Sequence, residues 1–347
     1  MKVCGLILAS VLVAAPVAHT PIAAQTQATG SEASTPPRTP WGAPDLQGIW
    51  DFLTGTPLER PDALADKAFL TEEEAAEVLE RIPEDRDAAR RRQFGDIDVG
   101  AEAWSLPPTR LNDTRRTSLI LDPPDGKLPP LTPAAQARED ARTRGQRPVR
   151  DRTRPDPATD GPEDLGLALR CILAFNAGPP YGGYGYNTHV QIFQTPDYVV
   201  LLNEMIHDAR IVPLDGRPHL PEGMRQWLGD LRGHWDGDTL VVDSTNFTDK
   251  IGSFTTQQGR ALGSGETLHL IERFTRVDAD TLHYEYTVDD VTTFTQPFTA
   301  AIPLKQIEGP IFEYACHEGN ARTMEVILTA GRAAEDGEPA GDGVTKR

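Results

Sequence analysis

The second half of the chain is a succession of short segments in which apolar and polar residues alternate, and this pattern constrains the fold most strongly. The alternation has the two-residue period of β-strands, and no helical pattern separates consecutive segments. Asp236-Gly237 suits a tight hairpin turn between two of them. Antiparallel strands in such a succession predict a closed barrel or a sandwich. The expected strands are 190–194, 198–206, 233–235, 238–245, 268–276, 281–287, 294–304 and 311–316, followed by a short helix over 323–334.

The N-terminal half has a different composition, rich in proline, arginine and acidic residues and poor in long apolar runs. We expect this arm to wrap around another core, because it has few apolar residues with which to build its own. Thr71 and Glu74 form a capping box that predicts the start of a helix, which Pro83 should interrupt. The expected elements of the arm are helices over 72–80 and 133–141 and a strand over 117–121. The expected organisation is a signal peptide (1–24), the arm (25–162), a β-barrel core (163–334) and a disordered tail (335–347).

One short motif favours a barrel over a sandwich. Gly48-Ile49-Trp50 lies on an early expected strand. It resembles the closed end of lipocalin-type barrels, where the tryptophan covers the floor and the glycine lets another segment approach. With the strand order, this resemblance implies a lipocalin-like antiparallel β-barrel.

The chain also resembles, over nearly all of its mature length, a large group of exported bacterial proteins of uncharacterised function. The resemblance lies in residues 41–50 (WGAPDLQGIW), 233–243 (GHWDGDTLVVD), 272–278 (ERFTRVD) and 314–320 (YACHEGN). It implies export and a lipocalin-like barrel, and it transfers no known activity. Residues 182–186 and 290–291 depart from the Asn-rich and Asp-Pro segments usual in this group.

The N-terminus predicts export to the periplasm or beyond. A positively charged start, an apolar run over 6–17 and small residues ending at Ala24 have the order of a secretory signal, and the run is too short for a membrane anchor. Cys4 is lost with this signal, so Cys171 and Cys316 remain. In an oxidising compartment an even pair predicts a disulfide, with two free buried thiols as the alternative.

Charge and motifs exclude several classes of partner. The 52 acidic residues against 34 basic ones give a net charge of -18, which argues against nucleic acids and anionic membranes. No apolar run after the signal is long enough to span a bilayer. Phosphate-binding and nucleophile-elbow motifs are absent from the sequence, so we expect no cofactor. His207, His219 and His234 are irregularly spaced, and His317-Glu318 lacks the second histidine of a metalloprotease motif, so we expect no metal.

Carboxylates on apolar strand faces are the sharpest functional signal. The two-residue period places Glu272 in phase with Leu270 and Phe274. Glu204 and Glu313 lie in the same way on apolar faces of their expected strands. If these faces point inward, desolvation raises the carboxyl pKa values unless a cation compensates, as a general acid or base near neutrality requires. The competing interpretation of each residue is a structural ion pair.

Other polar residues follow the expected strands directly. His207, Asp208 and Arg210 come after the strand of Glu204, where they could hold a carboxylate charged or orient a substrate. His317-Glu318 forms a second such cluster. The candidate catalytic residues are Glu272, Glu204, His207, Arg210 and His317, and the candidate ligand-binding residues are Tyr186, Asn187, Asp208, Tyr284, Tyr286, Glu313 and Glu318.

These observations favour an exported acid-base enzyme without a cofactor, acting on a small, partly apolar molecule by hydrolysis, elimination or isomerisation. Ionisable residues on apolar faces favour an enzyme, because a hydrophobic carrier needs mainly apolar walls. One alternative is a non-catalytic lipocalin-like protein that binds the same kind of molecule. The other is an interaction module whose barrel is filled with side chains.

Overall fold

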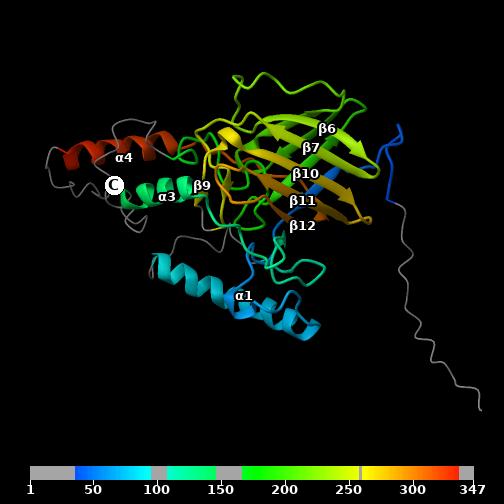
Figure 1. The fold of residues 1–347 in the computed structure, drawn as a ribbon, viewed down its shortest axis with the longest axis horizontal. Helices are drawn as coiled ribbons and strands as arrows, with labels where there is room; N and C mark the ends of the chain where they lie inside the picture. The colour runs from blue at the N-terminus through cyan, green and yellow to red at the C-terminus, as the bar shows by residue number, and fades with distance from the viewer. Residues whose placement is uncertain (1–35, 95–107, 146–165, 258–259, 336–347) are drawn as a thin grey trace, which may run out of the picture. The chain divides into compact units, whose positions relative to one another are not determined.

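The computed structural model describes residues 36–94, 108–145, 166–257 and 260–335, so the expected signal peptide and the tail from residue 336 lie outside the described residues. The chain is mainly β (Figure 1). The strands are β1 (Gly48–Asp51), β2 (Ile120–Asp122), β3 (His189–Gln194), β4 (Tyr198–Asn203), β5 (Ala209–Pro213), β6 (Asp230–Asp236), β7 (Thr239–Thr245), β8 (Phe254–Thr255), β9 (Ala261–Leu262), β10 (His269–Arg276), β11 (Thr281–Asp289) and β12 (Phe298–Ile307). The helices are α1 (Glu72–Phe94), α3 (Pro133–Gly145) and α4 (Asn320–Glu335), with 3₁₀ turns η1 (Asp62–Leu64), η3 (Met205–His207) and η4 (Gly265–Thr267).

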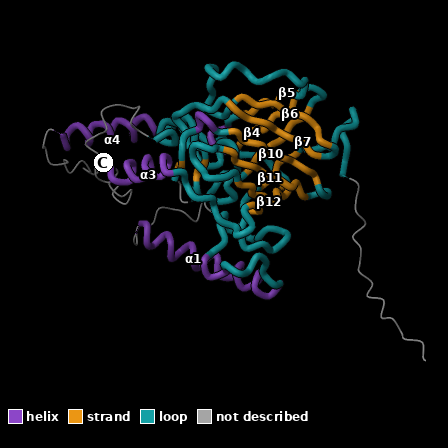
Figure 2. The backbone as a smooth tube through the Cα atoms, in the orientation of Figure 1, coloured by secondary structure: helices purple, strands orange, loops and turns teal. Residues whose placement is uncertain are grey.

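Ten strands form one antiparallel sheet (Figure 2). Its order is β5-β4-β3-β1-β12-β11-β10-β7-β6, and β2 also pairs with β12. β1 comes from the arm and lies between β3 and β12, so the arm supplies a central strand as well as surrounding segments.

The sheet is not closed into a barrel, which corrects the prediction. β5 and β6 are its two edges, and no backbone ladder joins them among the described strands. The edges still touch, because a Cβ atom added at Gly233 of β6 would lie 2.6 Å from Cγ1 of Val212 in β5. β5 ends at Pro213, which has no N–H to donate to a neighbouring strand. The edges therefore meet through side chains instead of hydrogen bonds.

The inward face of the sheet carries the core. In β10 the buried residues Leu270, Glu272 and Phe274 alternate with more exposed ones. Aromatic rings pack in the enclosed space, since the centroid of Tyr284 lies 4.9 Å from that of Phe274 and 5.6 Å from that of Tyr286. Aromatic side chains thus pack against one another on the inward face of the sheet.

The Gly-x-Trp motif lies on β1, as an early strand was expected to carry it. Trp50 is fully buried, its Nε1 donates to the carbonyl of Leu46 at 2.9 Å, and the guanidinium of Arg276 lies 5.2 Å from its ring centroid. Gly48 has φ +139°, and a Cβ atom there would lie 2.7 Å from Nε2 of Gln306. Only glycine allows this backbone conformation beside so close a neighbour.

Residues 311–316, predicted as a strand, are irregular. β12 is already paired on its two sides by β1 and β11, so a following strand has no free edge there to join. The segment also follows Pro310, which cannot donate a ladder hydrogen bond. Glu313 is consequently exposed and does not point into the core.

The arm is more regular than its composition predicts. The capping box is confirmed, with the Glu74 side chain accepting from Thr71 N at 2.8 Å. The helix does not stop at Pro83 but continues as α1. The arm also has a small core of its own around Leu70 and Leu111. One missing N–H removes a single helical hydrogen bond, and this packing helps to offset that loss.

Two predictions about the C-terminal half are confirmed. Cys171 and Cys316 form a disulfide with a Cα–Cα distance of 5.8 Å, which joins segments 145 residues apart. The short C-terminal helix is α4.

Candidate functional site

The predicted site residues fall into two separate groups, and the first is a buried ion-pair cluster. Arg210 of β5 donates from Nη1 to Oε1 of Glu272 at 3.1 Å and from Nη2 to Oε2, while the Tyr284 hydroxyl donates to Oε1 at 2.9 Å. The side chains of Arg210 and Glu272 have no exposed surface. The ring of Tyr181 packs 5.0 Å from that of Tyr284.

The electrostatics of this cluster are those of a structural pair. Burial alone would lower the pKa of Arg210, but the charge and hydrogen bonds of Glu272 raise it well above its usual value. Burial also raises the pKa values of Tyr284 and Tyr286. The guanidinium therefore stays charged beside the carboxylate, and neither side chain has exposed surface. The expected burial of Glu272 is confirmed, whereas its catalytic role stays a prediction.

Glu204 does not share the interior with Glu272, which corrects the predicted phase of its strand. The inward residues of β4 are Val199, Leu201 and Asn203, and Glu204 follows the end of the strand. It is nevertheless only 3% exposed. The segment after β12 covers it, because the Phe312 N–H donates to Oε1 of Glu204 at 3.0 Å.

The second oxygen of Glu204 holds a histidine. Nδ1 of His189, the first residue of β3, lies 2.7 Å from Oε2 of Glu204. The Asn187 side chain also hydrogen-bonds Glu204. The His189 side chain keeps 29% of its surface exposed, and its Nε2 has no hydrogen-bond partner among the described residues. We call His189 and Glu204 the dyad.

In the dyad, the pKa of His189 is raised and the pKa of Glu204 is lowered, each relative to its usual value. Burial alone would lower the pKa of His189, but the hydrogen bond to Glu204 and the charges of Glu204 and Asp51 raise it above its usual value. Burial alone would raise the pKa of Glu204, but hydrogen bonds from His189 and the Phe312 N–H hold it below its usual range. A carboxylate that accepts at Nδ1 orients the imidazole and makes it a stronger base at Nε2.

Polar and apolar groups surround the dyad on different sides. Asp51 of β1 is the cross-strand neighbour of His189 and binds Nη1 of Arg110 at 2.8 Å. The turn after Glu204 packs Met205 and Ile206 in a small apolar cluster that also includes Phe175, Tyr186 and Tyr314. The dyad therefore has both a charged pair and apolar, aromatic residues as neighbours.

Strained backbone is concentrated in this region. Of the seven described non-glycine residues with positive φ, five lie here: Cys171, Asn176, Asn187, Ile206 and His207. Ile206 has φ 61°, a conformation that is costly for a β-branched residue. Such strain persists only where the surroundings enforce it, and it is more frequent at functional sites than elsewhere.

Four further predicted residues, Asp208, His207, His317 and Glu318, are half-buried or exposed. Asp208 is half-buried, and burial raises its pKa against the opposing charge of His207. His207, His317 and Glu318 are exposed. Sequence analysis missed His189, whose alternation with Gln191 on the outer face of β3 is the pattern of an ordinary solvated strand residue.

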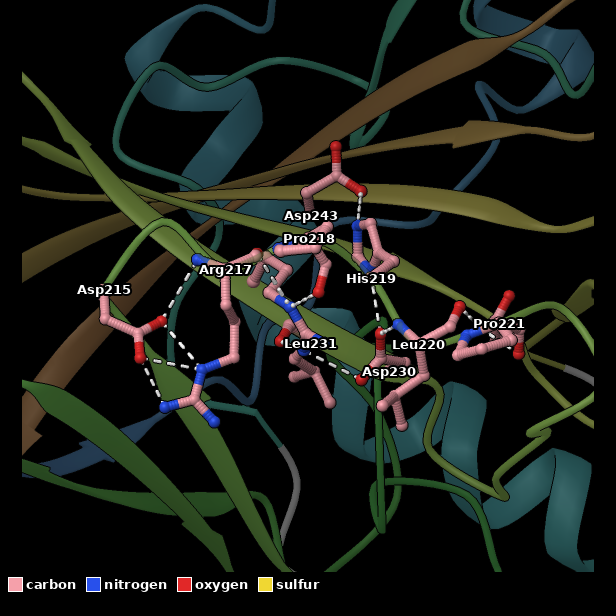
Figure 3. A network of polar contacts seen from close by, with 11 residues as sticks. Asp215, Arg217, Pro218, His219, Leu220, Pro221, Asp230, Leu231 and Asp243 are labelled. Atoms are coloured by element: carbon pink, nitrogen blue, oxygen red, sulfur yellow. Dashed lines mark hydrogen bonds and ion pairs between the residues drawn. The ribbon is translucent and has the colours of Figure 1, made fainter.

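A second histidine network lies on the outer face of β6 and β7 (Figure 3). Residues 214–229 connect β5 to β6, and we call them the strap. His219 of the strap places Nδ1 2.9 Å from Asp230 and Nε2 3.1 Å from Asp243, and Nε2 of His269 lies 3.1 Å from both oxygens of Asp243. Asp230 also accepts from Leu220 N at 2.8 Å. This network fixes the strap over the outside of the edge strand.

Within the described ranges, no group of three or more His, Cys, Asp or Glu side chains is arranged to hold a metal ion. The helices in those same ranges include none that is long and apolar enough to cross a membrane. No family model matches the chain, and no curated protein matches its sequence.

Proposed function

We propose that the protein is an exported acid-base enzyme that acts on a small, partly apolar molecule at the dyad. The observation that carries the proposal is the geometry of His189, whose Nδ1 lies 2.7 Å from a nearly buried carboxylate while the ring stays 29% exposed. The disulfide supports export, because such bonds persist in oxidising compartments.

In this proposal His189 takes and returns the proton. With its Nδ1–H held by Glu204, the neutral imidazole has its lone pair at Nε2, and the raised pKa of His189 makes that nitrogen the base. Asp208, whose pKa burial raises, is the candidate proton donor in the turn after Glu204. This arrangement fits hydrolysis by an activated water, elimination or isomerisation.

The site proposed here lies at the start of β3 and just after the end of β4 instead of inside the sheet. The aromatic packing around Tyr284 and the pairing of Glu272 with Arg210 support this change, because neither leaves the interior carboxylate exposed. The apolar contacts for a substrate would come from the cluster that includes Tyr186 and Tyr314.

The test compares three variants on a panel of small esters, lactones and β-hydroxy carbonyl compounds. His189→Asn and Glu204→Gln should each lower the turnover found for the wild type by about 10²-fold or more. His283→Asn, the same change on the outer face of β11, is the matched control and should leave turnover unchanged. Equal turnover in His189→Asn and the control would show that the dyad is not the active site.

A further inference from the structure

A groove lies on the outer surface where the two sheet edges meet. Its volume is about 210 Å³. β4 and β5 supply Tyr198, Ile211 and Pro213, β6 supplies Leu231 and Arg232, and the strap supplies Arg217. The dyad lies beyond the opposite end of β4 from Tyr198. This groove is therefore independent of the proposed active site.

One wall of the groove is apolar and continues across the sheet. Ile211 is 59% exposed and points outward from β5. Its cross-strand neighbour is Val200 of β4, whose neighbour in turn is Phe193 of β3, which is 43% exposed. These three residues form an apolar row on the outer face that begins at the groove.

The other wall carries two oriented guanidinium groups. Arg217 binds Asp215 through Nε and Nη2, as Figure 3 shows, and its Nη1 has no partner in the described part of the chain. Arg232 donates from Nε to the carbonyl of Pro218 at 2.8 Å and from Nη1 to Asp230 at 2.8 Å. Its Nη2 likewise has no partner among the residues described. Each arginine is thus held in place while one of its terminal nitrogens has no partner among the described residues.

We propose that this groove binds a small amphipathic carboxylate, with its head at the arginines and its apolar chain along the row. Guanidinium groups match the planar geometry and the charge of a carboxylate. The acidic groups nearby, Asp215 and Asp230, are already engaged by arginines, so they do not offer a site to a cation.

The size of the groove sets how such a ligand lies. Its volume of about 210 Å³ is below the range of about 300–1,000 Å³ typical of pockets that enclose a drug-sized ligand. The groove therefore holds the carboxylate head and the first carbons of the ligand. The rest of the ligand's alkyl chain covers Ile211 and Val200. A second copy of the protein fits less well, because each copy carries a net charge of -18.

The test measures the binding of decanoate by calorimetry and by the ¹³C NMR signal of its carboxylate. Wild type should bind decanoate more tightly than hexanoate, and decylammonium should not bind.

Arg217→Gln should weaken decanoate binding by about tenfold. Arg273→Gln, on β10, removes a comparable exposed pair with Asp236 of β6 and should have no effect. Ile211→Ser changes an exposed residue, so it keeps the test informative if Arg217→Gln fails to fold.

Three outcomes would overturn the proposal. Equal binding by Arg217→Gln and Arg273→Gln would show that the guanidinium is not used. Binding of decylammonium as tight as that of decanoate would show unspecific apolar contact. A dimer in ultracentrifugation that Ile211→Ser abolishes, with decanoate binding unchanged, would assign the row to a second copy. Glu204→Gln should leave decanoate binding unchanged, which separates this site from the proposed active site.

Discussion

Glu272 and Glu204 are both buried carboxylates paired with a basic side chain, yet the two basic partners differ in their access to solvent. Glu272 is paired with Arg210, and neither side chain has any exposed surface. Glu204 is 3% exposed, but its partner His189 keeps 29% of its side chain at the surface, and its hydrogen bond to Glu204 helps to raise its pKa above the usual value. Both regions therefore contain a buried carboxylate. They differ in whether its partner is exposed to solvent, as His189 is and Arg210 is not.

The two pairs also hold the fold in different ways. Arg210 and Glu272 join β5 to β10 across the core, so both charges have lost their water and depend on each other. His189 and Glu204 join the start of β3 to the turn after β4 and depend on the segment that carries Phe312. The first arrangement stabilises the core, and the second positions an exposed ring.

The largest expected effect comes from breaking the core pair. Glu272→Leu leaves the Arg210 guanidinium buried without a counter-charge and should lower the free energy of unfolding by about 3–5 kcal/mol. The double variant Arg210→Met/Glu272→Leu should recover most of this loss, because it removes both charges. Chemical denaturation measures both. A single variant as stable as the wild type would mean that the pair does not stabilise the core, and Glu272 would again become a candidate for function.

The disulfide should matter chiefly for the dyad region. Replacing Cys171 and Cys316 with serine should lower the free energy of unfolding by about 2–4 kcal/mol. Hydrogen exchange should rise in residues 308–318, which cover Glu204, and stay unchanged in β10 and β11 around Glu272. A uniform rise across the sheet would contradict the assignment of the disulfide to one region.

Both residues of the dyad should make the stability of the fold depend on pH. The raised pKa of His189 stabilises the fold below its ordinary value of 6.5, and this contribution is lost as pH rises through the folded value. The lowered pKa of Glu204 stabilises the fold above 4.5, and this contribution is lost as pH falls through the folded value. The difference in melting temperature between wild type and His189→Asn should thus be greatest between pH 4.5 and 6.5.

Titration of His189 by NMR gives an independent check of this sign. In Glu204→Gln the pKa of His189 should fall relative to that of the wild type, because the main group that raises it is lost. An unchanged pKa of His189 would show that Glu204 does not control the imidazole.

The smallest effect should come from a more exposed histidine pair. The hydrogen bond to Asp243 raises the pKa of His269, but the two side chains are 39% and 36% exposed. Solvent screens such pairs, so His269→Asn should lower the free energy of unfolding by less than about 1 kcal/mol. Thermal melts at pH 5.5 compare the stability of His269→Asn with that of His189→Asn. A cost for His269→Asn equal to or larger than that for His189→Asn would show that exposure does not set the strength of these pairs.

The sequence alone predicted the β architecture, the disulfide and the burial of Glu272, and the structure confirms all three. Alternation in residues 268–276 has one apolar and one mostly polar phase, so the inward face of β10 follows from the period of a strand. Only two cysteines lie beyond the expected signal, which left one intramolecular pairing. These features depend on local pattern or on counting, and both are read directly from a chain.

Tertiary structure decided the rest, because it depended on which segments meet. In β4 both phases are apolar, with Val199 and Leu201 facing inward and Val200 and Leu202 outward, so alternation could not place Glu204. Whether residues 311–316 form a strand depended on a free sheet edge, and β1 from the distant arm had already paired with β12. The dyad joins His189 to Glu204 through a turn and is completed by Phe312, more than 100 residues further along the chain. A local pattern carries no information about such a meeting, since the free energy that selects it comes from packing distant segments together.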